Sequence, residues 1–278
     1  MKKPRLHRLT FGRILQYVFL YGITLIVILP VMNIFISAFK TNPEIMRSTL
    51  LPANWNFDNF KKVFDQRIFY TGMLNSIVIT VGSLLISTVL AALAAYPMAR
   101  SNKKIYTILY LFFLSANMIP AVSSMIPLYS MLRSLHLINS RLGIILVYAS
   151  RLSMGILLFT SFYKTIPKEL EEAAEIDGCN YLQRFFKVLF PMLKPISVSY
   201  VMVSILGIWN DFLFPQVFLA DRDKQPITLA VYTFSNEYGS DWGAIFALMS
   251  IAVLIPMLVF ICNQKYFFEG ISVGAVKG

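Results

Sequence analysis

The chain has 278 residues, of which 57% are hydrophobic and only 14% carry a charge. Soluble domains carry roughly 25% charged residues, so this composition excludes an ordinary soluble domain and indicates a membrane protein. The formal net charge of +11 would suggest nucleic acid as a partner of a soluble chain, but basic residues also collect in the cytoplasmic loops of membrane proteins, and no nucleic-acid-binding motif is present.

Long stretches with few or no charges predict six membrane-spanning helices, because a helix needs about 20 apolar residues to cross a bilayer. The first stretch follows a basic segment, residues 1–13, and has no small-residue cleavage site, so we expect an uncleaved first span. The expected spans are residues 14–38, 75–99, 105–132, 142–162, 195–218 and 242–264, and a tail, 265–278, follows. The predicted fold class is therefore all-α, a polytopic membrane protein with one transmembrane domain over residues 14–264.

Small and helix-breaking residues add detail to these spans. A run of alanines, Ala91, Ala92, Ala94 and Ala95, predicts a helix that a neighbour approaches closely. Pro120 and Pro127 interrupt the third span, either to line a pathway or as plain kinks. The loop before the second span has room for a short helix around residues 59–64, and it is either a contact surface for an external partner or an ordinary loop.

Charged residues fall inside two of the expected spans. Arg151 lies inside the fourth span, where a lone arginine points to a substrate or gating role, or else to a water-filled vestibule or a carboxylate of a partner subunit. The fifth span contains Trp209-Asn210-Asp211, which combines an aromatic face, an amide and a carboxylate. Such groups suit a sugar, and the alternative is interfacial anchoring by the tryptophan with a solvated aspartate.

A polar insert, Pro167–Pro191, separates the fourth and fifth spans and holds five of the 14 acidic residues. Its first half predicts a short helix that begins near Pro167, carries a narrow stripe of Leu170, Ala173 and Ala174, and stops at Gly178. Its second half predicts an amphipathic helix with an apolar stripe at Leu182, Phe185, Phe186 and Leu189. We expect three acids to lie on an exposed face without basic partners, namely Glu171, Glu172 and Glu175.

The distribution of basic residues gives an orientation for the six spans. With both termini in the cytoplasm, the cytoplasmic segments hold 15 lysines and arginines and the external segments hold nine, with Arg151 left in a span. This asymmetry agrees with the positive-inside rule. The polar insert then falls on the cytoplasmic side.

The insert also carries a motif. Glu172-Ala173-Ala174 is followed after three residues by Gly178, and after nine more by Val188-Leu189-Phe190-Pro191. This resembles the EAA loop of ABC-importer permeases, whose pattern is Glu-Ala-Ala, three residues, Gly, nine residues and Ile-x-Leu-Pro. Val188 and Phe190 depart from that pattern, and both remain apolar. Other segments are similar to the sugar-importer branch, in particular to second permease subunits of the maltose-transporter type: Asn75-Ser76, Ala94-Ala95-Tyr96 to Ala99-Arg100, Ile126-Pro127-Leu128-Tyr129, Trp209-Asn210-Asp211-Phe212 and Gly274-Ala275-Val276-Lys277-Gly278.

The resemblance implies a subunit of an ATP-driven importer in a bacterial cell membrane, with both termini cytoplasmic. It implies that a helix–turn–helix coupling loop, residues 163–191, docks on a cytosolic ATPase through Glu172, Ala173, Ala174, Asp177, Gly178 and Pro191. We expect Gly178 to tolerate change least, because it needs a positive φ and has no room for a side chain. The loop 220–241 would reach toward the binding protein, and Arg151, Trp209, Asn210 and Asp211 would lie on the substrate path.

The same resemblance implies the partners: a second permease subunit, two ABC ATPases and an extracytoplasmic binding protein that delivers a sugar, with an oligosaccharide favoured. No phosphate-binding loop, metal-ligand spacing or nucleophile motif is present, so we expect no enzyme activity, no metal and no cofactor in this chain, and we assign ATP and Mg to the ATPase. The alternatives are an importer of a polyol or a glycerol-phosphate-like solute, an integral-membrane enzyme, and a stand-alone secondary transporter.

Overall fold

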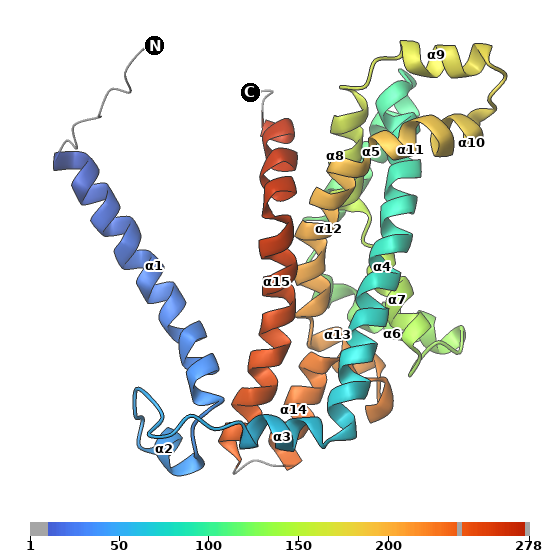
Figure 1. The fold of residues 1–278 in the computed structure, drawn as a ribbon. Helices are drawn as coiled ribbons and strands as arrows, with labels where there is room; N and C mark the ends of the chain where they lie inside the picture. The colour runs from blue at the N-terminus through green and yellow to red at the C-terminus, as the bar shows by residue number, and fades with distance from the viewer. Residues whose placement is uncertain (1–10, 238–240, 276–278) are drawn as a thin grey trace. The chain divides into compact units, whose positions relative to one another are not determined.

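The chain is all-α over the residues that the structure, a computed structural model, describes, which are 11–237 and 241–275 (Figure 1). It divides into two compact units, one made of Met1–Asp65 with Phe234–Ile251 and the other of Gln66–Thr233 with Ala252–Gly278. The predicted basic segment 1–13 and tail 265–278 fall partly outside the described residues.

Within the described residues, the first unit contains α1 (Phe11–Ser37), α2 (Asn42–Met46), α3 (Asp58–Phe64), the last residues of α14 (Ile227–Glu237) and the first turns of α15 (Trp242–Ala275). Helix α3 confirms the short helix expected around residues 59–64. Its buried Asn59 amide donates to the carbonyl oxygens of Ala38 and Lys40 at 2.8 and 2.9 Å. Gly243 approaches the same amide so closely that a Cβ there would lie 2.5 Å from the nitrogen, so this contact requires glycine.

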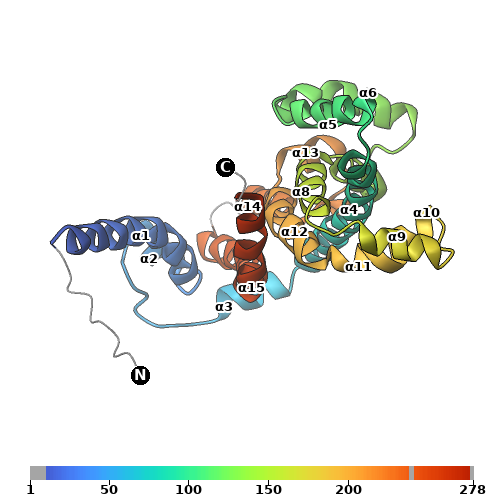
Figure 2. The ribbon, with the colours of Figure 1, turned by 90° about the horizontal axis from the view of Figure 1, so that it is seen from above.

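The second unit is organised around the 34-residue α4 (Arg67–Arg100), which packs against four helices: α5 (Lys104–Ala116), α7 (Arg141–Ala149), α8 (Ser153–Tyr163) and α12 (Lys194–Trp209). Ala91, Ala92 and Ala95 are fully buried in these contacts. A Cβ on Gly155 of α8 would lie 2.6 Å from the Ala91 Cβ, so the two backbones are close. The predicted close approach at the alanine run is thereby confirmed (Figure 2).

Besides the remainder of α15, short elements make up the rest of the second unit and the passage back to the first. They are η1 (Ala121–Ser124), α6 (Met125–Ser134), α9 (Glu169–Ile176), α10 (Tyr181–Gln183), the π-helical η2 (Arg184–Leu189), α11 (Phe190–Met192), α13 (Leu213–Phe218), η3 (Arg222–Lys224) and α14 (Ile227–Glu237). In Figure 1, α9 and the α10–α11 segment lie at the end of this unit where α4 finishes.

Three helices are long and apolar enough to cross a membrane singly, over residues Leu15–Ser37, Arg67–Arg100 and Trp242–Lys265. Three bent pairs pass the same test: α5 with η1–α6 at 102°, α7 with α8 at 45°, and α10–α11 with α12 at 73°. By length and composition, the described residues therefore offer up to six spans if each pair counts as one.

The structure differs from several of the expected spans. The fourth, 142–162, is divided into α7 and α8, which are bent by 45°. Residues 195–218 do not form one helix, because α12 ends at Trp209 and α13 begins at Leu213. Helix α12 has 16 residues and is about 24 Å long, which is shorter than a hydrocarbon core of about 30 Å. The second span was expected from residue 75, but α4 begins eight residues earlier, at Arg67.

Candidate functional site

The polar insert forms a helix, a tight turn and a second helix. Helix α9 ends at Ile176, and Gly178 then has a φ of +81°, which confirms the predicted left-handed glycine. The Gly178 N–H donates to the Glu175 carbonyl at 3.0 Å, and the Cys179 N–H donates to the Ala174 carbonyl at 2.9 Å. The last carbonyls of α9 are thus satisfied at this glycine, as in common helix ends.

The second helix of the insert starts with a capping box. The Asn180 side chain accepts from the Gln183 N–H, and the Gln183 side chain accepts from the Asn180 N–H, both at 2.9 Å. This reciprocal pair satisfies two N–H groups that the first turn leaves without partners. Local polar residues therefore define the turn between the two helices.

One face of α9 and its turn lies open to solvent. Glu172, Ala173, Asp177 and Gly178 are all exposed, and Ile176 is 87% exposed. A Cβ on Gly178 would meet nothing within 4 Å. The expectation that Gly178 has no room for a side chain is therefore wrong within this chain, and its constraint is the positive φ alone.

Glu171 corrects the expected face of exposed, unpaired acids. It is only 8% exposed, and one carboxylate oxygen lies 2.6 Å from Arg100 Nε and 2.5 Å from Arg100 Nη2. The other oxygen accepts from the Tyr96 hydroxyl at 2.6 Å. Both partners belong to the last turn of α4, so a contact between distant segments buries this acid.

Glu175 also has a basic partner, since its carboxylate lies 2.5 Å from Arg184 Nη1. This pair is more open, because the Glu175 side chain is 65% exposed. Glu172 and Glu175 therefore keep the expected exposed position, whereas Glu171 is buried, and Glu175 differs from the expectation only in having a basic partner. The exposed face therefore carries less charge than its sequence suggests.

The apolar stripes of the insert are split between a buried base and the surface. Ala174 is buried, whereas Leu170 and Ala173 are exposed, so the predicted first stripe is not one contact face. In the second stripe, Phe185 and Leu189 are fully buried while Leu182 and Phe186 are exposed. The buried members join a core beneath the loop with Tyr96, Phe159, Tyr163, Ile166 and Leu193. Pro191, at the start of α11, is exposed.

At the other end of α4, a second polar cluster holds the loop that follows α13. The buried Asn75 amide donates to the carbonyl oxygens of Asp223 and Gln225, both at 2.9 Å. The Arg67 guanidinium lies 2.9 Å from the Asp223 carboxylate. Asp221 caps η3, and the hydrogen bond from the Asp223 N–H holds the pKa of its carboxyl below the usual value. One helix thus contacts the polar insert at one end and this loop at the other.

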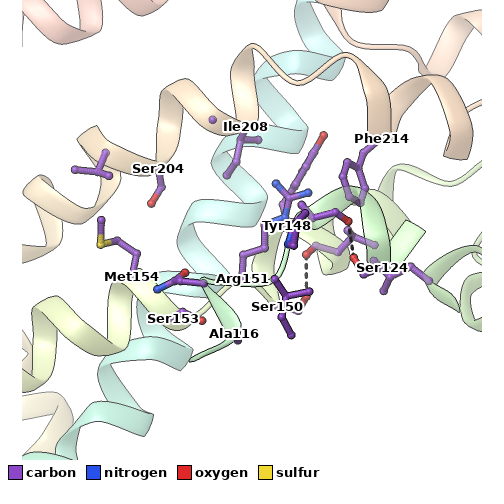
Figure 3. A pocket seen from close by; sticks show the side chains of 18 of the residues that line it. Ala116, Ser124, Tyr148, Ser150, Arg151, Ser153, Met154, Ser204, Ile208 and Phe214 are labelled. Carbon is purple, nitrogen blue, oxygen red and sulfur yellow. Dashed lines mark hydrogen bonds between the residues drawn. The ribbon is translucent and has the colours of Figure 1, made fainter. Parts of the chain in front are cut away.

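A pocket of about 780 Å³ lies among the bent helices (Figure 3). Three parts of the chain line it: the break between α5 and η1, the break between α7 and α8, and one face of α12. The polar residues of this lining are Asn117, Ser124, Tyr148, Ser150, Arg151, Ser153, Tyr200 and Ser204. The volume falls in the range of about 300–1,000 Å³ that is typical of small-molecule sites. Because Pro120 is among the lining residues, the first proline of the third span adjoins this pocket.

Arg151 occupies the break between α7 and α8. Its guanidinium carbon lies 4.9 Å from the Tyr148 ring centroid and 4.5 Å from that of Phe214. Its Nη2 lies 3.7 Å from an Asp211 carboxylate oxygen. A carboxylate of a partner subunit was one of the alternatives for Arg151, and within this chain its carboxylate neighbour is Asp211. Figure 3 shows Arg151 beside Tyr148 at the pocket.

The three residues of the Trp209–Asp211 cluster have different surroundings. The Trp209 ring is buried, and its Nε1 donates to the Ala252 carbonyl at 3.1 Å, so it packs in the protein and does not line the pocket. Asn210 is exposed. Asp211 lies between α12 and α13, where its Oδ1 accepts hydrogen bonds from the N–H groups of Leu213 and Phe214, at the start of α13, at 3.0 and 3.2 Å. The structure therefore brings together Arg151 and Asp211 but leaves Trp209 apart.

Several functional candidates were not found from sequence. Tyr96 and Arg100 lie at the end of the second expected span, and their spacing of four residues places both on one helix face. That spacing is a usable signal for a shared ligand such as a carboxylate. Tyr148 gave no signal, because a tyrosine in an apolar helix is common in packed cores. Among the described residues, no cluster of three or more metal-binding side chains occurs.

Comparisons with known proteins agree with this arrangement. Residues 87–273 match the family model described as binding-protein-dependent transport system inner membrane component. The chain is 34% identical over 87% of its length to the melibiose/raffinose/stachyose import permease protein MelC of Bacillus subtilis, covering 88% of that protein. It is 32% identical over 91% of its length to the diacetylchitobiose uptake system permease protein NgcG of Streptomyces coelicolor, covering 85% of that protein.

The fold is also similar to a chain of a bacterial ABC transporter involved in the import of the acidic polysaccharide alginate. The TM-score is 0.81 at 23% identity, and the match covers 96% of this chain and 99% of that one. The chain therefore belongs to the family of inner membrane components of binding-protein-dependent transport systems.

Proposed function

We propose that this chain is a permease subunit of an ATP-driven importer for an oligosaccharide, which an extracytoplasmic binding protein delivers. The relatives MelC and NgcG are import permeases named for oligosaccharides, and each aligns over most of this chain. The chain itself is a permease component and not an enzyme, so ATP hydrolysis, with Mg, belongs to separate ATPase subunits. A permease for a polyol or a glycerol-phosphate-like solute is the alternative.

The complex that we propose contains this chain, a second permease subunit, two ABC ATPases and the binding protein. The chain lies in a bacterial cell membrane with both termini in the cytoplasm. The cytoplasmic segments would hold 15 basic residues and the external segments nine, and this difference supports the orientation. In this orientation, α9 faces the cytosol.

The surface that meets the ATPase is the exposed face of α9 and its turn, with Glu172, Ala173, Asp177 and Gly178 at its centre and Ala174 and Pro191 in support. The observation that carries this assignment is an exposed apolar stripe on α9, formed by Leu170, Ala173 and Ile176, of which Ile176 is 87% exposed. Contiguous exposed apolar residues rimmed by polar ones, here by Glu172 and Asp177, mark protein contact sites. The open space at Gly178 admits a partner surface close to the backbone.

The substrate path passes the pocket between the bent helices, with Arg151 and Asp211 at its polar end and Asn210 exposed at the same break. Hydroxyl groups and aromatic rings line this pocket, and such groups bind sugars by hydrogen bonds and by stacking. Trp209 supports this region from behind, through its bond to Ala252.

Co-purification of the tagged chain with its ATPase tests the proposal. We compare the wild type with Gly178→Asp and Ile176→Asp, which place a charge on the exposed face. Thr165→Asp is the matched control, because it adds the same charge to an exposed position before α9. We expect the wild type and the control to retain the ATPase and both face variants to lose it. A wild type that purifies as a stable homo-oligomer without an ATPase would contradict the proposed function.

A further inference from the structure

We propose that Glu171 is a positioning residue that locks the coupling helix α9 to the end of α4, so that the two move as one body. The inference rests on the proposed function, because it concerns how α9 transmits movement from the ATPase. It goes further by adding a direct side-chain connection to α4, which the covalent connections of α9 to α8 and α10 do not provide.

The first support is that both oxygens of the Glu171 carboxylate have polar partners on α4. Arg100 Nε and Nη2 contact one oxygen at 2.6 and 2.5 Å, and the Tyr96 hydroxyl donates to the other at 2.6 Å. The side chains of Glu171 and Arg100 are only 11% and 14% exposed. Ion pairs that are shielded in this way are screened far less by salt than surface pairs.

The second support is that the partners of Glu171 also hold the surroundings of α9. Arg100 Nη2 donates to the Ile166 carbonyl at 2.9 Å, at the segment that leads into α9. The Tyr96 ring packs against the rings of Tyr163, Tyr181 and Phe185, with centroids 5.5, 5.0 and 6.4 Å away. The last turn of α4 therefore holds the entry to α9, its first turn and the helix that follows.

The third support is what α4 contacts elsewhere. This 34-residue helix is about 51 Å long and packs against α7, α8 and α12. Near its other end, Asn75 holds the loop that contains Asp223 and Gln225. A displacement of α9 that α4 follows thus reaches the opposite end of the same unit.

The Glu175–Arg184 pair provides a matched control within the same helix. Its acid lies one helical turn from Glu171 and the pair has the same charges, but the Glu175 side chain is 65% exposed, while that of Arg184 is 19% exposed. An ion pair with a solvated carboxylate contributes less to structure than one whose two members are both shielded. We therefore assign the locking role to Glu171 and not to acidic residues of α9 in general.

The experiment measures the distance between spin labels on α9 and at the end of α4 in the purified complex with its ATPase. Labels are attached through Glu169→Cys and Asn102→Cys, after Cys179→Ser and Cys262→Ser remove the native thiols. Spectra are recorded without nucleotide and with Mg, ATP and orthovanadate, which trap the closed ATPase. We expect one unshifted distance distribution in the wild type and in Glu175→Gln, and a nucleotide-dependent shift or splitting in Glu171→Gln.

A loss of stability alone lowers the yield of complex but does not produce a nucleotide-dependent distance. A wild-type distribution that shifts with nucleotide, or an unshifted distribution in Glu171→Gln, overturns the inference. If Glu171→Gln yields no complex, Tyr96→Phe decides in the same way, since it removes one hydroxyl and keeps the ring. Absence of the ATPase from the wild type is a different result, which defeats the proposed function itself.

Discussion

Glu171 and Glu172 are adjacent in the sequence, yet one is buried in an ion pair and the other faces solvent. Burial of a carboxylate costs several kcal/mol unless partners compensate for lost hydration. Arg100 and Tyr96 supply that compensation from a helix about 70 residues earlier. No local pattern distinguishes the two acids, because the difference lies in which of them points toward α4.

The first prediction concerns the stability of this buried pair. Glu171→Ala leaves the Arg100 guanidinium buried without its partner, so we expect a loss of about 3–5 kcal/mol in the free energy of unfolding. Glu175→Ala should cost less, about 1–2 kcal/mol, because the Glu175 side chain is 65% exposed although Arg184 is only 19% exposed. Thermal unfolding of the detergent-purified protein measures both. Equal losses in the two variants would show that burial does not distinguish the pairs.

A second prediction at this scale concerns Glu44, which lies in α2 of the first unit and whose carboxylate holds the loop that follows. Its carboxylate accepts from the Ala53 and Thr41 N–H groups at 2.7 Å, and these bonds, with that of Ala53 contributing most, hold its pKa below the ordinary 4.5. A lowered pKa in the folded state gives stability that is present above the ordinary pKa and lost as pH falls through the folded value.

We therefore expect the Ala53 amide to lose protection from hydrogen exchange only once the pH drops below about 4.5, after correction for the intrinsic exchange rate. In Glu44→Gln, which cannot ionise, protection should be lower at neutral pH and should show no such transition. An identical pH profile in both proteins would mean that Glu44 does not control this loop.

Among the elements, the contact between α4 and α8 depends on small residues. Gly155 faces Ala91 so closely that a Cβ would lie 2.6 Å from the alanine Cβ and 3.2 Å from the Tyr200 ring. The alanine run in α4 predicted a close neighbour, but the sequence did not identify Gly155 as its partner. Helix packing pairs residues across large sequence separations, and only the assembled unit shows which ones meet.

The third prediction follows from this contact. Gly155→Val adds three carbons where no space exists, so we expect a loss of about 1–3 kcal/mol from overpacking. Gly207→Ala is the control, because a Cβ at that helical glycine meets nothing within 4 Å and should leave stability unchanged or slightly raised. The unfolding midpoints of the two variants test this. A stable Gly155→Val protein would indicate that α4 and α8 separate without cost.

The bent helix pairs belong to the same scale. Pro120 and Pro127 indicate an interruption in the third span, but they do not indicate a bend of 102° or a pocket beside it. The breaks at Arg151 and Asp211 contain no proline. At the first break, the Arg151 guanidinium lies close to the rings of Tyr148 and Phe214. At the second, the Asp211 carboxylate accepts from the N–H groups of Leu213 and Phe214, at the start of α13.

At the scale of the whole molecule, the two ends of the second unit are chemically different. One end presents α9 and its exposed Ile176, and the other presents the loop around Asp221, joined to α4 through Asn75. A span that crosses the membrane separates its ends by the full bilayer thickness. The two loops should therefore be accessible from opposite sides.

The fourth prediction uses this separation. With the native cysteines replaced by serine, single Ile176→Cys and Asp221→Cys variants are treated with a membrane-impermeant maleimide. In intact cells permeable only at the outer membrane, we expect Asp221→Cys to react, whereas Ile176→Cys should react only in inside-out vesicles. Labelling of both positions from the same side would contradict the proposed orientation.

By itself, the sequence determined the fold class, the membrane location, the helix–turn–helix of the insert and the family, because composition, hydropathy and residue spacing are local properties of the chain. It also determined the positive φ at Gly178, since a helix end of this kind needs a residue without a Cβ. Only the tertiary structure decided that Glu171 is buried, that Arg151 pairs with Asp211, that Trp209 packs inward and that the fifth expected span is broken. Each of these depends on contacts between segments far apart in the sequence, where burial and charge compensation override what a single helix prefers.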